Sequence, residues 1–81
     1  MFVILDARKL STKESAHPYL KKVFHFPDYY GNNLDALYDC LSEMPPVRVL
    51  VTHSREAGDY FSKVLSVFED LPDTEIHYIE P

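Results

Sequence analysis

The 81-residue chain has little of several residue types, and each shortage narrows the class of protein. Its one cysteine cannot form an internal disulfide, whereas a domain this small in an oxidising compartment usually carries several. No apolar run approaches the roughly 20 residues that cross a bilayer, and the apolar start at residues 1–5 is shorter than a secretory signal. These absences predict a cytoplasmic protein with no membrane segment.

Glycine is also scarce, because Gly31 and Gly58 are the only two in the chain. A glycine-rich phosphate-binding loop is therefore excluded. The four histidines show no metal-ligand spacing and no second cysteine accompanies them, so we expect no metal site and no cofactor. Cys40 falls on the apolar side of its predicted helix, where a thiol packs in the core and is inert. Nothing in these patterns indicates an enzyme.

The composition is that of an ordinary globular protein, with 46% hydrophobic and 26% charged residues. A chain of this length forms one small domain, so we expect a single domain over residues 1–81.

Charge is unevenly distributed along the chain, whose net charge is −5. Residues 1–27 hold five basic and two acidic side chains, whereas residues 28–81 hold three basic and eleven acidic ones. No lysine or arginine lies between Lys22 and Arg48. An acidic surface repels nucleic-acid phosphates and attracts basic proteins, so we expect no direct binding to nucleic acid. Solubility alone would explain the acidic excess equally well.

Hydrophobic periodicity predicts an alternation of strands and helices along the chain. The predicted strands cover residues 2–5, 47–52 and 75–79. The predicted helices cover residues 15–24 and 34–43, and a third helix runs from residue 56 or 57 to residue 71. This order predicts a small three-stranded parallel sheet joined by helical crossovers. Three helices are too few to cover both faces of the sheet, so we expect a two-layer α/β sandwich.

The second predicted helix, capped by Asn33, carries two carboxylates on one face. Asp35 and Asp39 lie one turn apart, opposite the apolar side of the helix, and no basic residue lies one turn away to relieve their repulsion. Tyrosines border this face at positions 29, 30 and 38. Carboxylates beside tyrosines suit a surface that binds a basic protein. A solvated acidic face with half-buried tyrosines explains the same pattern.

Two other functions fit parts of this face less well. The spacing of Asp35 and Asp39 is not far from that of glycosidase carboxylates, but so short a chain can hardly form a sugar cleft. An adaptor that docks a basic protein other than a nuclease remains an open alternative.

Residues 26–41 read FPDYYGNNLDALYDCL. This segment closely resembles the central motif of the barstar family of ribonuclease inhibitors. The two share the positions of their tyrosine, glycine, asparagine and aspartate residues. Outside the motif, two weaker matches to the family occur in the same order along the chain. They are Lys21-Lys22 in the first predicted helix and the end of the last predicted helix. The resemblance implies the family's fold, which agrees with the sandwich predicted above.

The resemblance also implies a function and a site. It implies a cytoplasmic immunity protein, or antitoxin, that forms a 1:1 complex with a basic, barnase-like ribonuclease or a related toxin nuclease. Asp39 would fill the phosphate site of the enzyme, Asp35 would make a second acidic contact, and Tyr29 would pack against the catalytic histidine. The remaining positions implied at the interface are Tyr30, Gly31, Asn33, Leu34, Tyr38, Ser42 and Asp70.

The chain departs from the family pattern in three places. Position 38 is tyrosine where barstar has tryptophan. The loop after Ser42 reads Glu43-Met44-Pro45-Pro46, which is shorter than in barstar and borders the expected interface. Relative to the family, residues are also missing between the second predicted strand and the last predicted helix, so we expect one short helix there to be lost or trimmed.

Overall fold

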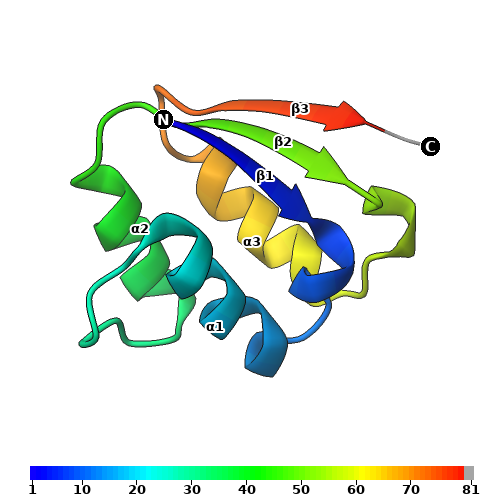
Figure 1. The fold of residues 1–81 in the computed structure, drawn as a ribbon, viewed down its shortest axis with the longest axis horizontal. Helices are drawn as coiled ribbons and strands as arrows, with labels where there is room; N and C mark the ends of the chain where they lie inside the picture. Colours follow the sequence, from blue (N-terminus) through cyan, green and yellow to red (C-terminus); the bar gives the residue numbers. More distant parts are fainter. Residues whose placement is uncertain (80–81) are drawn as a thin grey trace.

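The computed structural model describes residues 1–79, so the last two residues of the predicted domain lie outside the described part (Figure 1). Its elements are the strands β1 (Phe2–Asp6), β2 (Arg48–Thr52) and β3 (Glu75–Ile79), the helices α1 (Lys13–Phe24), α2 (Leu34–Ser42) and α3 (Tyr60–Glu69), and two short 3₁₀ helices, η1 (Ala7–Leu10) and η2 (Ser54–Glu56). All three predicted strands and all three predicted helices are present.

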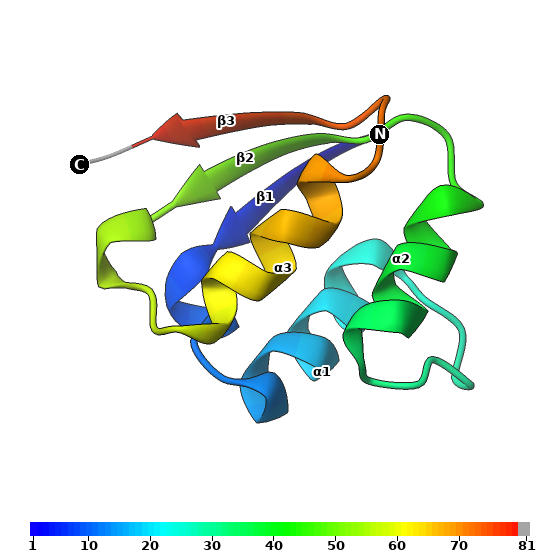
Figure 2. The same ribbon diagram turned by 180° about the vertical axis from the view of Figure 1, so that it is seen from behind.

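The three strands form one parallel sheet in the order β1-β2-β3. Val3, Leu5, Val49 and Val51 point to one face and are at most 5% exposed. Phe2, on the opposite face, is 58% exposed. Figures 1 and 2 show α1, α2 and α3 gathered on the same side of the sheet. The structure therefore confirms the two-layer α/β sandwich.

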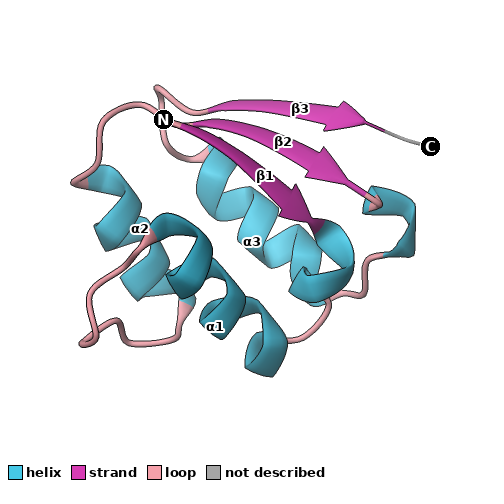
Figure 3. Cartoon of the chain, viewed as in Figure 1, coloured by secondary structure: helices cyan, strands magenta, loops and turns pink. Residues whose placement is uncertain are grey.

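The helices differ from the prediction mainly at their starts. α1 begins at Lys13 and not at Ser15, because the Thr12 hydroxyl caps it by accepting a hydrogen bond from the Ser15 N–H at 3.2 Å. The predicted helix over residues 56–71 is also wrong at its start. A separate three-residue 3₁₀ helix, η2, precedes α3, which begins at Tyr60 (Figure 3).

The late start of α3 follows from a close contact of two loops. The Gly58 N–H donates to the Ser11 hydroxyl at 2.9 Å, and the Tyr60 N–H donates to the Ser11 carbonyl at 3.4 Å. A Cβ atom at Gly58 would lie 3.0 Å from the Ser11 carbonyl oxygen, so only glycine fits without movement. Gly58 and Tyr60 are thereby bound to Ser11, and residues 57–59 do not continue a helix.

The helical layer has a continuous core that positions α2. Leu37 and Leu41 on α2 are buried together with Leu20 and Phe24 on α1. Because this apolar stripe faces inward, the opposite side of α2 faces solvent. None of the helices in residues 1–79 combines the length and apolar character that crossing a membrane requires.

Candidate protein-binding site

Tyr29 lies at the tip of the turn that joins α1 to α2. His25 ends α1 in a left-handed conformation, and its N–H donates to the carbonyls of Lys21 and Lys22. Pro27 follows, and its carbonyl accepts a hydrogen bond from the Tyr30 N–H at 2.9 Å, which closes the turn. The Tyr29 side chain projects from this turn and is 85% exposed. An exposed aromatic ring on a closed turn can contact a partner at low entropic cost.

Tyr29 and Asp39 meet at one hollow although they are ten positions apart. The hollow measures about 400 Å³, and Glu43 and Met44 line it as well. The end of α1 and the following loop also line it. We call it the Tyr29–Asp39 hollow. The structure thus brings together the aromatic and the acidic residue that the resemblance implies as central contacts.

Asn33 and Gly31 fix how α2 begins. The Asn33 side-chain oxygen accepts a hydrogen bond from the Ala36 N–H at 2.8 Å, which confirms the predicted N-cap. The Asn33 amide also donates to the Gly31 carbonyl at 3.1 Å. Asn32, and not Gly31, has the left-handed backbone, with φ of 54°. Gly31 instead provides space, because a Cβ atom there would lie 3.2 Å from the Asn33 amide nitrogen.

Tyr30 lies in the core, which contradicts its predicted role as a surface contact. Its side chain is only 5% exposed, and its ring centroid lies 4.8 Å from that of Phe26. Its hydroxyl forms a hydrogen bond with Nδ1 of the buried His17 at 2.7 Å. Burial raises the pKa of the Tyr30 hydroxyl well above its ordinary value of 10.0. Tyr30 therefore fixes the turn from below, while its neighbour Tyr29 points out.

The solvent side of α2 presents Asp35, Tyr38, Asp39 and Ser42, all of them exposed. Neither aspartate forms an ion pair with any of residues 1–79. The Ser42 hydroxyl donates to the Asp39 carbonyl at 2.8 Å, so it is already engaged within the helix. Asp35 occupies the first turn, where the helix dipole favours an anion. Both carboxylates are thus available to cationic groups of a partner.

A second hollow continues this face toward the end of α3. It measures about 180 Å³, and Tyr38, Ser42, Met44 and Asp73 contribute to its lining. We call it the Tyr38–Asp73 hollow, and Met44 borders both it and the Tyr29–Asp39 hollow. Asp70 is the exposed residue that directly follows α3, and it does not itself line the hollow. Sequence reasoning missed Asp73, which lies in the loop between α3 and β3.

A third hollow lies at the other end of α2. Leu34 is half-buried there and lines the hollow together with Asp35, Tyr60, Lys13 and Lys63. We call it the Lys13–Lys63 hollow. Sequence reasoning also missed these two lysines, because they belong to helices far apart in the chain.

Cys40 is partly buried beside the Tyr29–Asp39 hollow and packs against the core. Burial raises the pKa of its thiol, and the carboxylates of Glu43 and Asp39 add to the effect, so the thiol stays protonated. Among residues 1–79, no group of three or more histidine, cysteine, aspartate or glutamate side chains is arranged to hold a metal ion.

The fold and this face define a small α/β protein with α1, α2 and α3 on one side of a parallel sheet and with the acidic helix α2 exposed at one end. The chain belongs to the barstar family. The family model described as barstar (barnase inhibitor) matches residues 1–77. The chain is also 39% identical over 77 residues to YrdF of Bacillus subtilis (strain 168), which carries the provisional name of a ribonuclease inhibitor. This match covers 88% of the chain and 85% of YrdF.

Family membership confirms the resemblance based on residues 26–41. It supports the role of a ribonuclease inhibitor and the assignment of the chain to a family of inhibitors rather than of enzymes.

Proposed function

We propose that the protein inhibits a small basic ribonuclease by covering its active site with Tyr29 and the solvent side of α2. The observation that carries this proposal is the common hollow of Tyr29 and Asp39, which joins an exposed ring and an unpaired carboxylate. A ribonuclease concentrates cationic groups where it holds the phosphates of RNA. A carboxylate that enters such a site takes the place of a phosphate and excludes RNA by competition.

Asp39 makes the central contact in this proposal. It lies midway along α2, between the two hollows that Met44 borders. Partner side chains that fill both hollows would therefore shield Asp39 from water. Desolvated charge pairs at the centre of an interface have large coupling energies. Asp35 makes a second acidic contact one turn earlier on the same helix, and Tyr29 packs its ring on the enzyme beside Asp39.

The rest of the face has supporting roles. Tyr38 and Ser42 contact the enzyme at the rim, and Asp70 with Asp73 extends the acidic surface beyond them. Asn33, Gly31 and Leu34 set the position of the start of α2. Tyr30 acts from the core, through its hydrogen bond to His17.

The charge of the protein favours a basic partner. The net charge is −5, and no lysine or arginine occurs from position 23 to position 47. Long-range attraction accelerates association with a basic enzyme, and salt weakens this attraction. We infer that the complex forms quickly in the producing cell, where the protein acts in the cytoplasm as an immunity protein against a toxic ribonuclease.

The proposal is tested by titrating the protein into barnase that is cleaving a fluorescent RNA substrate, at low and at high salt. We expect activity to fall linearly to zero at one equivalent at low salt, with slower association at high salt. Full activity at a large excess of the protein would contradict the proposal. A different basic protein would then be the target, and affinity capture from the producing cells would identify it.

A further inference from the structure

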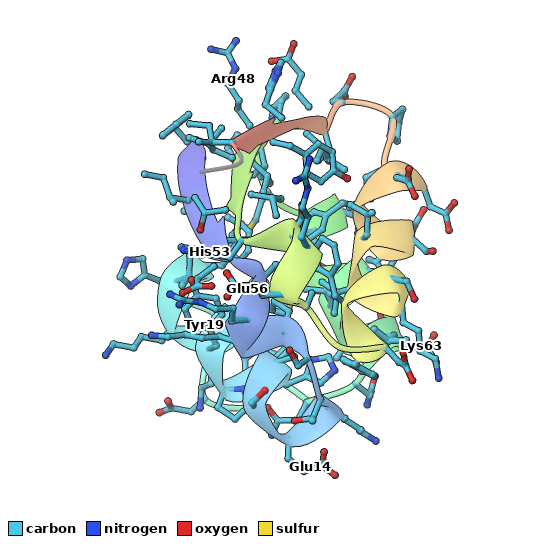
Figure 4. The ribbon with its side chains drawn as sticks, turned by 90° about the vertical axis from the view of Figure 1, so that its right-hand side faces the viewer. Glu14, Tyr19, Arg48, His53, Glu56 and Lys63 are labelled. Carbon is cyan, nitrogen blue, oxygen red and sulfur yellow. The ribbon has the colours of Figure 1, made fainter. Side chains whose placement is uncertain are left out.

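The Lys13–Lys63 hollow is where the first turns of all three α-helices meet. Lys13 is the first residue of α1, Asp35 is the second residue of α2, and Lys63 is the fourth residue of α3. These three residues line the same hollow, which measures about 360 Å³. Figure 4 shows Lys63 on the outer side of α3, at the edge of the molecule. The hollow therefore borders the acidic face of α2 directly.

Both lysines lie where the stability of their own helix disfavours them. The N-terminal end of a helix carries partial positive charge and prefers acidic side chains. α3 has no acidic residue in its first turn, and α1 has only Glu14. Neither Lys13 nor Lys63 forms an ion pair within the described chain. Folding alone thus does not explain why two cations stand at this place.

The hollow is lined by side chains of both positive and negative charge. Asp35 lines it together with the two lysines. Within residues 1–79, Asp35 forms no ion pair with either lysine. Glu14 and Asp59 are the nearby acidic residues at the starts of α1 and α3. The hollow therefore separates an anion from two unpaired cations and leaves room for a side chain from outside.

We infer that Lys13 and Lys63 contact an acidic side chain of the bound ribonuclease, next to the basic group that meets Asp35. This inference rests on the proposed function and adds a chemical requirement for the partner. The enzyme must carry a carboxylate on the rim of its basic active site, at the place that faces the first turns of α1 and α3. An enzyme with a wholly basic rim would be repelled there, so the two lysines discriminate between related ribonucleases.

The test compares charge reversals in the full-length protein, with barnase as the probe. Lys63→Glu and the double variant Lys13→Glu, Lys63→Glu remove the contact. Lys22→Glu is the matched control, because Lys22 is an exposed, unpaired lysine on α1 that lines a different hollow. Each reversal at a helix start places an acid where the dipole favours it, so we expect these variants to fold. Thermal unfolding followed by circular dichroism checks this.

We expect Lys63→Glu to weaken binding to barnase at least threefold relative to Lys22→Glu, the double variant to weaken it at least tenfold, and Lys63→Arg to retain wild-type affinity. Alanine substitution of the acidic residues on the rim of barnase then identifies one that shows coupling with Lys63 in a double-mutant cycle. Equal or tighter binding by Lys63→Glu than by Lys22→Glu would overturn the inference. A wild-type protein that leaves barnase fully active would instead overturn the proposed function itself.

Discussion

The buried hydrogen bonds of His17 make the stability of the protein depend on pH. His17 is fully buried, and its two ring nitrogens lie 2.7 Å from the Tyr30 hydroxyl and 2.6 Å from the Tyr60 hydroxyl. A neutral ring donates from one nitrogen and accepts at the other, so both hydroxyls are satisfied. Burial lowers the pKa of His17 below its ordinary value of 6.5, and Lys13 contributes in the same direction.

The direction of the pH effect follows from this lowered pKa. Below pH 6.5 the unfolded chain binds a proton at His17, whereas the folded protein keeps the ring neutral until the pH reaches its lower folded pKa. Between these two pKa values, the free energy of unfolding therefore decreases as the pH falls. The slope reaches at most about 1.4 kcal/mol per pH unit from this one residue. Above pH 6.5 the contribution of His17 is complete and constant.

The measurement is urea unfolding followed by far-ultraviolet circular dichroism between pH 4.5 and pH 8, since the chain has no tryptophan for fluorescence. We expect His17→Phe to be less stable at pH 8 but to lose the His17 part of the slope. His77→Gln, at an exposed position of β3, should keep it. A slope in His17→Phe as steep as in the wild type would refute the reasoning, because another group would then bind the proton.

Three substitutions test other parts of the structure in the same unfolding assay. Tyr30→Phe leaves a buried nitrogen of His17 without a partner and should lower the free energy of unfolding by about 1–3 kcal/mol, whereas no loss would show that the hydrogen bond does not stabilise the fold. Asn33→Ala removes the N-cap of α2 and should lower the free energy of unfolding by about 0.5–2 kcal/mol. Asn33→Ser is the control, because serine also caps a helix and should keep most of the stability. Asn32→Ala is unsuitable as a control because Asn32 has a left-handed backbone. Gly58→Ala should cost about 1–3 kcal/mol because its Cβ would crowd Ser11, and a stabilised variant would contradict the close contact.

The sequence predicted the parts of the fold that depend on local pattern. Asn33 was predicted as the cap of α2 from its residue type and position. The strand over residues 75–79 was predicted at its observed bounds although its apolar alternation is imperfect. The start of α3 was wrong, because the hydrogen bonds of Gly58 and Tyr60 to Ser11 join segments about 47 positions apart. Local periodicity carries no information on such contacts.

The candidate site shows the same division. The periodicity of α2 predicted that Asp35 and Asp39 share its solvent side, and both are exposed. Nothing in the sequence distinguished the exposed Tyr29 from the buried Tyr30, because the turn at Pro27 decides which of the two rings enters the core. The meeting of Lys13 and Lys63 at one hollow was equally invisible, since three helix starts converge only in the folded protein.

The central claim is that Asp39 anchors the protein in a cationic active site, and the affinity of Asp39→Ala for barnase tests it most directly. Glu56→Ala is the matched control, because Glu56 is an exposed carboxylate far from α2. It lies on the side of the molecule that faces the viewer in Figure 4, whereas α2 lies at the opposite end in Figure 1. We predict that Asp39→Ala weakens binding by about 2–5 kcal/mol, because buried cationic groups of the enzyme lose their partner, while Glu56→Ala binds almost as tightly as the wild type. Equal affinities of wild type and Asp39→Ala would contradict the account.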